Sequence, residues 1–175
     1  MYKIAVTGSP GSGKSKALKF FESLGAVTID LDSIARDLLN PGTVEFEATV
    51  EAFGGGIVRE DGQMDRRKLR NKIIYNEDDR HILEAIMWPS IEAEFENHLK
   101  EIPFDGTVVV EVAILTIGFR RFFDKVVLVV APKDVKIERI MKRDNCTAHE
   151  ADALISMHPD DSERRISADV VIDNP

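Results

Sequence analysis

The residues with the clearest chemical signature lie near the start of the chain. The pattern G-x-x-x-x-G-K-[ST] is matched without a mismatch by Gly8, Ser9, Pro10, Gly11, Ser12, Gly13, Lys14 and Ser15. Glycines at this spacing let backbone N–H groups turn toward phosphate oxygens, and the positive end of the following helix faces the same anion. A lysine in this position reaches the β- and γ-phosphates, and the hydroxyl after it binds Mg²⁺. The motif therefore predicts a site for a nucleoside triphosphate with Mg²⁺, and we assign Lys16 to the same binding set.

Two aspartates, Asp30 and Asp32, follow the next apolar run. Ligands of open α/β sheets bind at the carboxyl ends of the strands, so both side chains are candidates for one site. If the strand continues past Asp30, its alternation points the two carboxylates the same way. A carboxylate there can accept the proton of an attacking hydroxyl or hold a water on Mg²⁺. The spacing fits a structural role equally well, in which one of them caps a helix starting near Ser33.

A site that moves a phosphoryl group must also spread positive charge around that group. Arg139 and Arg143 are four residues apart, so they share one face of one helix and are candidates for this role. The alternative is an ordinary solvated helix face, with Glu138 and Lys142 beside them. Arg164 and Arg165 are further candidates to close on the nucleotide.

Glu111 ends a valine-rich run that has the composition of a buried strand. A charged side chain in such a run needs a partner, so we expect Glu111 in the site, acting on the metal through a water. The alternative is a strand-end acid exposed to solvent. With Ser15, Glu111 completes the predicted metal-binding set.

The most basic stretch of the chain is RRKLRNK, residues 66–72. Such a stretch is more often a solvated helix face, but it can also steer an anionic ligand toward a site. Asp65, directly before it, is expected to cap the helix that starts at Arg66.

Composition and charge limit the possible partners. The chain has 175 residues, a net charge of −8 and one cysteine, Cys146. No basic footprint for nucleic acid is present, and an internal disulfide is excluded, which favours a reducing compartment. The most apolar stretch, residues 107–119, carries Glu111 and is too short to span a bilayer. With the phosphate-loop pattern starting at Gly8, we expect no signal peptide and a cytoplasmic protein; the oligomeric state is not predicted.

These residues must be positioned by strands that alternate with helices. Apolar runs predict strands at 2–6, 26–29, 107–112, 125–130 and 170–172. Helices are expected at 14–24, 31–39, 43–53, from 66 to about 100 with a break at Pro89, at 132–142, and in two later stretches. The order predicts a three-layer α/β/α fold with a mostly parallel five-stranded sheet.

The whole chain, 1–175, is expected to form a single domain. Its core covers about 1–40 and 105–175, and a helical insertion at about 41–104 is suited to hold a second substrate. A helical lid is expected at about 139–165. A helix covering the last strand is also expected in such a fold, and the sequence ends at Pro175.

Six segments of the sequence resemble the dephospho-coenzyme A kinase family over nearly the whole chain. They are TGSPGSGKS, TIDLDSIAR, DGQMDRRKL, LEAIMWPSI, MKRD and ADVVIDN, in this order. The resemblance implies a P-loop kinase that moves the γ-phosphate of ATP to the ribose 3′-hydroxyl of dephospho-coenzyme A. It implies that Asp32 is the general base and that Arg36 helps hold the acceptor.

The resemblance assigns further residues to the two substrates. Arg143 with Asp144 matches the family's lid, which adds Arg143 to Lys14 and Asp32 as a catalytic candidate. Asn174 matches a residue near the adenine, and Arg139 is placed with it in the ATP set. On the acceptor side the candidates are Asp30, Asp32, Arg36, Arg66 and Trp88.

The sequence departs from the family pattern mostly on the acceptor side. Trp88 stands where the family usually has histidine, and Glu111, Ala113 and Ile117 replace an aspartate, a proline and a glutamate. Trp88 can stack on a base or fill core. The departures leave two alternatives to phosphorylation of dephospho-coenzyme A: a P-loop kinase acting on another nucleoside or nucleotide, and a nucleotide-binding regulator without catalysis. A GTPase is disfavoured because no N-K-x-D run follows a strand.

Overall fold

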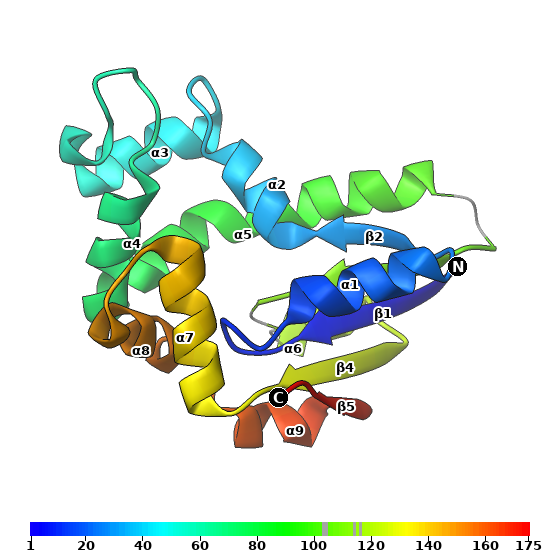
Figure 1. Ribbon diagram of the computed structural model, residues 1–175. Coiled ribbons are helices and arrows are strands. Elements are labelled where there is room, and N and C mark those ends of the chain that lie inside the picture. The colour runs from blue at the N-terminus through cyan, green and yellow to red at the C-terminus, as the bar shows by residue number, and fades with distance from the viewer. Residues whose placement is uncertain (103–104, 114, 116) are drawn as a thin grey trace. The chain divides into compact units, whose positions relative to one another are not determined.

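Figure 1 shows the computed structural model of the chain, which describes residues 1–102, 105–113, 115 and 117–175. Ile114 and Thr116, in the segment that departs from the family pattern, lie outside the described residues, and of Ile117 only the backbone is described. The chain forms two compact units, one of residues 1–31 and 102–175 and one of residues 32–101.

The first unit is built on a five-stranded sheet in the order β2-β3-β1-β4-β5, in which every pairing is parallel. The strands are β1 (Tyr2–Thr7), β2 (Val27–Asp30), β3 (Thr107–Glu111), β4 (Lys125–Val130) and β5 (Val170–Asp173). The valine-rich runs of β3 and β4 are almost entirely buried, as expected for inner strands of a parallel sheet. The predicted open α/β fold with a parallel sheet is therefore confirmed.

The core of this unit forms where α1 (Lys14–Ser23) packs on the sheet. Leu18 of α1 lies against Val6, Val109, Val127 and Val129. Burial of these branched side chains fixes the strand register and the start of α1 together, and so fixes the loop between β1 and α1.

The register aligns the carboxyl ends of the strands. Glu111 of β3 is the pairing partner of Val6 on one side and of Asp30 on the other. The remaining helices of the unit are α6 (Ile117–Arg120), α7 (Lys133–Asp144), α8 (Ala148–Ser156) and α9 (Asp161–Ser167). Helices α7 and α8 contact each other, and α9 packs on β4 (Figure 1).

The second unit is helical, with a core of its own. It contains α2 (Leu31–Leu38), which starts at the last residue of the first unit, then α3 (Val44–Phe53), the 3₁₀ turn η1 (Gly55–Ile57), α4 (Arg66–Tyr75) and α5 (Glu77–Glu101). Phe46, Ile57, Met64 and Leu69 are buried together. The predicted cap is confirmed: the Asp65 carboxylate accepts a hydrogen bond from the Lys68 backbone N–H at 3.0 Å.

One helix boundary expected in this region is wrong and another is confirmed. Pro89 does not break the helix, and α5 runs through it. Proline lacks the N–H that donates a helical hydrogen bond, but burial of Met87, Ile91 and Phe95 stabilises the helix by more than this loss. The helix expected at 31–39 is confirmed as α2 (Leu31–Leu38), whereas the start near Ser33 that the capping alternative assumed is not observed, so Asp32 lies in the first turn of α2. The alternation argument for Asp30 and Asp32 therefore does not apply, and Asp32 is not the residue that precedes the helix.

Candidate active site

The loop between β1 and α1 has the backbone shape that its glycines permit. Gly13 is left-handed, with φ 101°, and directly precedes α1. Gly11 is also left-handed, and a Cβ there would lie 2.6 Å from the Lys136 carbonyl oxygen of α7. A side chain at Gly11 would therefore need both a disfavoured φ and space that α7 already fills.

Lys14 and Ser15 meet Glu111 at the carboxyl end of β3. The Lys14 ammonium donates to the Gly8 carbonyl at 3.0 Å and lies 3.8 Å from the Glu111 carboxylate. The Ser15 hydroxyl donates to the other Glu111 oxygen at 3.1 Å. The Lys14 and Glu111 side chains are each 9% exposed, so their charges face each other with little solvent between them. The structure thus brings together three residues that the sequence assigns to the triphosphate and metal site.

The oxygen donors of this group fit Mg²⁺. This ion keeps several waters and substrate oxygens and takes few protein ligands, so the Ser15 hydroxyl and the Glu111 carboxylate are a sufficient protein contribution. A larger metal-binding cluster of histidine, cysteine or acidic side chains is not found in the described part of the chain.

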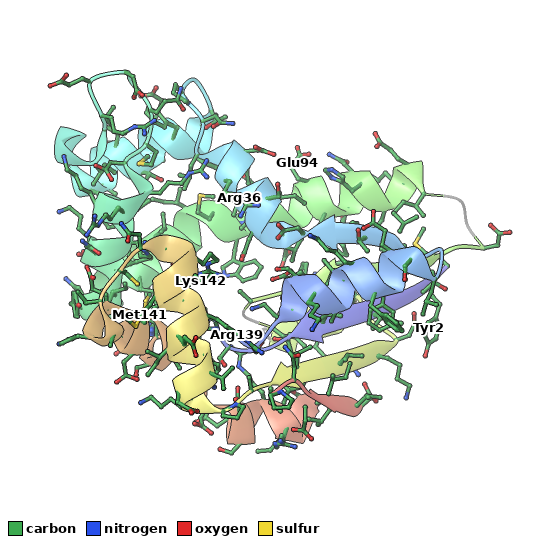
Figure 2. The ribbon with its side chains drawn as sticks, in the orientation of Figure 1. Tyr2, Arg36, Glu94, Arg139, Met141 and Lys142 are labelled. Atoms are coloured by element: carbon green, nitrogen blue, oxygen red, sulfur yellow. The ribbon has the colours of Figure 1, made fainter. Side chains whose placement is uncertain are left out.

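Two further predicted residues of the ATP set hold the loop from outside. Figure 2 shows Arg139 extending from α7 toward the loop, where its guanidinium donates to the Gly11 carbonyl at 3.3 Å and the Asn174 carbonyl at 3.1 Å. The Asn174 side-chain amide donates to the Ser12 carbonyl at 2.9 Å. Arg139 and Asn174 therefore link α7 and the end of β5 to the loop backbone.

Arg143 lies one turn further along α7 and is arranged differently. Its side chain is 60% exposed and binds the neighbouring Asp144 through two hydrogen bonds, at 2.7 and 3.0 Å. Arg165, which the sequence also suggested for the nucleotide, is half exposed and lies 3.8 Å from Asp173.

Sequence reasoning missed Lys136 and gave Arg164 a different role. Arg164 of α9 is 6% exposed and donates to the Thr7 hydroxyl at 2.7 Å and the Ala113 carbonyl at 3.0 Å. Burial lowers the pKa of its guanidinium, and the charge of Asp161 opposes that shift. Lys136 of α7 is 7% exposed and donates to the Ser9 hydroxyl at 3.0 Å. No sequence pattern marks a lysine on a charged helix as buried, so this contact could not be read from the chain.

The acceptor-side candidates divide between the two units. Asp30 ends β2 in the first unit, and Asp32 and Arg36 lie on α2 in the second. Within the second unit, the Arg66 guanidinium donates to the Arg36 carbonyl at 3.3 Å. Trp88 is half-buried on α5.

The second unit also contains a cavity of about 400 Å³. It is lined by Leu39, Arg59, Gln63, Met64, Asp65, Arg66 and Arg67. Three guanidinium groups and one carboxylate give this lining a positive balance. The sequence indicated Arg66 but not Arg59. Arg59 lies in a turn in which the Gly62 N–H donates to the Arg59 carbonyl, and its side chain lines the same cavity as Arg66.

A sequence model described as dephospho-CoA kinase matches residues 2–175. The chain belongs to the dephospho-CoA kinase family. The dephospho-CoA kinase of Aromatoleum aromaticum is 35% identical over 175 residues, which cover 99% of this chain and 85% of that protein. The dephospho-CoA kinase of Mycolicibacterium paratuberculosis is also 35% identical over 175 residues, but this chain spans only 43% of that longer protein.

The solved structures similar to this chain include a member of the same family. A crystal structure of a Thermus thermophilus protein has a TM-score of 0.81 at 25% identity, covering 99% of this chain and 88% of that one. The dephospho-CoA kinase from Campylobacter jejuni has a TM-score of 0.65 at 27% identity, covering 98% and 87%. The family makes this chain a kinase with a small-molecule substrate. Among the described residues, no helix is both long and apolar enough to cross a bilayer.

Proposed function

We propose that this protein transfers the γ-phosphoryl group of Mg²⁺-ATP to the ribose 3′-hydroxyl of dephospho-coenzyme A, in the cytoplasm and without a nucleic-acid partner. The observation that carries the proposal is the group formed by Lys14, Ser15 and Glu111 at the end of β3, in a chain whose family match runs over residues 2–175. Such a group is suited to hold and neutralise a triphosphate.

The ATP side of the reaction rests on the phosphate loop. Lys14, held by the Gly8 carbonyl and Glu111, would donate to the β- and γ-phosphates, and Arg139 and Asn174 would keep the loop in shape around them. Mg²⁺ bound near Ser15 and Glu111 would neutralise charge on the phosphate oxygens. Arg143 would supply a further positive charge after leaving Asp144, in the lid expected at about 139–165.

The acceptor side rests on Asp32 and the arginines of the second unit. As the 3′-oxygen forms its bond to the γ-phosphorus, the bond from that phosphorus to the β–γ bridging oxygen breaks and ADP leaves. The proton of the 3′-hydroxyl passes to the Asp32 carboxylate, with Asp30 nearby in sequence to orient the ribose. We assign the anionic part of the acceptor to Arg36 and Arg66 and propose that Trp88 contacts the same ligand.

The test is acceptor-dependent ADP release by the wild type, by Asp32→Asn and by Asp37→Asn. Asp37 is an exposed carboxylate on the same helix, so its substitution controls for the change in charge. We expect Asp32→Asn to lower kcat by about 10²-fold or more and Asp37→Asn to leave it unchanged. Equal rates for all three proteins would remove Asp32 as the base. ATP binding with no turnover of dephospho-coenzyme A by the wild type would overturn the proposed substrate.

A further inference from the structure

Two buried cations lie behind the phosphate loop and take no part in the proposed chemistry. They are Lys136 of α7 and Arg164 of α9, exposed by 7% and 6%. Lysine and arginine are rarely buried without partners, because an unpaired buried charge is costly. Their positions therefore depend on the groups that receive their hydrogen bonds.

These groups lie on either side of Gly8. Arg164 donates to the Thr7 hydroxyl at 2.7 Å, and Lys136 donates to the Ser9 hydroxyl at 3.0 Å. The carbonyl of Gly8 itself accepts the hydrogen bond from Lys14. Three consecutive residues at the start of the loop are thus held by three different cations, of which only Lys14 belongs to the recognised motif.

One carboxylate connects the two buried cations. The Lys136 ammonium donates to Asp161 of α9 at 2.9 Å, and the charge of Asp161 also stabilises the charged form of Arg164. Arg164 further donates to the Ala113 carbonyl, two residues after Glu111. The cluster of Lys136, Asp161 and Arg164 therefore joins α7 and α9 to the carboxyl ends of both β1 and β3.

We propose that Lys136 and Arg164 are positioning residues for ATP, which set the conformation of the loop at Thr7, Gly8 and Ser9 and through it the affinity for the triphosphate. The proposal rests on the proposed function only in that Mg²⁺-ATP is the ligand of this loop. A loop held from behind loses less conformational freedom when it closes on phosphate, so its affinity is higher.

The test measures affinity for a non-hydrolysable ATP analogue with Mg²⁺, in the absence of any acceptor. Lys136→Met removes the donor to Ser9 and is expected to weaken binding by about 10-fold, the order expected for one lost hydrogen bond to a charged group. Lys133→Met is the matched control, because Lys133 lies on the same helix with its side chain 60% exposed and is ion-paired to Asp152. It should bind as the wild type does.

A second variant separates positioning from stability. Lys136→Met leaves Asp161 without its ammonium partner and is expected to lower the Tm. The double variant Lys136→Met/Asp161→Asn removes both charges, so it should recover much of the Tm but none of the affinity. Recovery of both, or single-variant binding within twofold of the wild type, would overturn the proposal.

Arg164 is tested against its neighbour in sequence. Arg164→Gln should raise the KM for ATP and leave the KM for dephospho-coenzyme A unchanged, while Glu163→Gln, at an exposed residue of the same helix, should change neither. Equal effects on both substrates would show a general loss of structure and overturn the role of Arg164. A wild type that binds ATP but does not phosphorylate dephospho-coenzyme A would contradict the proposed function and leave this inference standing, because the affinity measurement needs no acceptor.

Discussion

The phosphate loop and the arginine-lined cavity of the second unit both carry positive charge, but they hold it in different ways. In the loop, Lys14 is 9% exposed and is fixed by a backbone carbonyl and a buried carboxylate. In the second unit, Arg66 is exposed and donates to one backbone carbonyl. A fixed charge can stabilise a transition state without rearrangement, whereas an exposed charge contributes mainly to attraction and binding. The comparison predicts that substitutions in the loop impair kcat and that substitutions in the cavity impair acceptor binding.

The largest effect is expected for Lys14→Met. Removal of this charge should lower kcat by about 10²–10³-fold, because the developing charge on the phosphoryl group loses a fixed partner. Steady-state ADP release measures the effect, and Lys19→Met, an exposed substitution on the same helix, serves as the control. Comparable losses of kcat in both variants would show that the fixed position of Lys14 does not contribute to catalysis.

A smaller effect of the same kind is expected for Gly11→Ala. The new Cβ would lie 2.6 Å from a backbone oxygen of Lys136, so the loop must shift, and kcat/KM for ATP should fall by about 10²-fold. Gly25→Ala is the control, since Gly25 is also left-handed but a methyl group placed there would have nothing within 4 Å. It should cost about 1 kcal/mol of unfolding free energy and leave both KM values unchanged. An unchanged kcat/KM in Gly11→Ala would show that the loop tolerates displacement.

A substitution in the cavity is expected to change the KM for the acceptor rather than kcat. Arg66→Met should raise the KM for dephospho-coenzyme A by about 10-fold, the order expected for one lost hydrogen bond to a charged group, with the KM for ATP within twofold. Lys72→Met, an exposed change of the same charge on α4, should leave both values unaltered. A fall in kcat with unchanged KM would place Arg66 in the chemical step and remove the contrast between the two regions.

The smallest effect is expected away from both regions, at Asp169. Backbone donation from Val126 lowers the pKa of Asp169; burial opposes this shift, and Lys125 and Arg120 add smaller lowering effects. A carboxylate whose pKa is lowered by folding stabilises the protein above its unfolded pKa of about 3.9, and this contribution is lost as the pH falls through the folded value. Asp169→Asn should therefore lower the Tm at pH 7 by a few degrees.

Thermal scans across pH check this prediction. The difference in Tm between wild type and Asp169→Asn should shrink below about pH 4. Asp173→Asn, on an 80% exposed side chain, should change the Tm little at any pH. A difference that persists at acidic pH would assign the effect to the hydrogen bonds rather than to the charge.

Much of the fold and of the ATP site follows from local sequence. Continuous valine runs predict inner parallel strands, and Asp65 predicts a helix start. The glycine spacing predicts a loop with positive φ angles, a conformation that favours glycine. These features depend on neighbours in the chain, so periodicity and turn chemistry are enough to predict them. The same local reasoning broke α5 at Pro89, because packing of distant side chains outweighs the preference of a single residue.

The tertiary structure alone decided which charges are buried and what they hold. Lys136 and Arg164 look like ordinary residues of polar helices, yet each is almost fully covered and donates a hydrogen bond where β1 passes into the phosphate loop. Their partners are 127 and 157 residues away in sequence. Burial of a charge depends on which distant donors and acceptors the fold brings to it, and no local pattern contains that information.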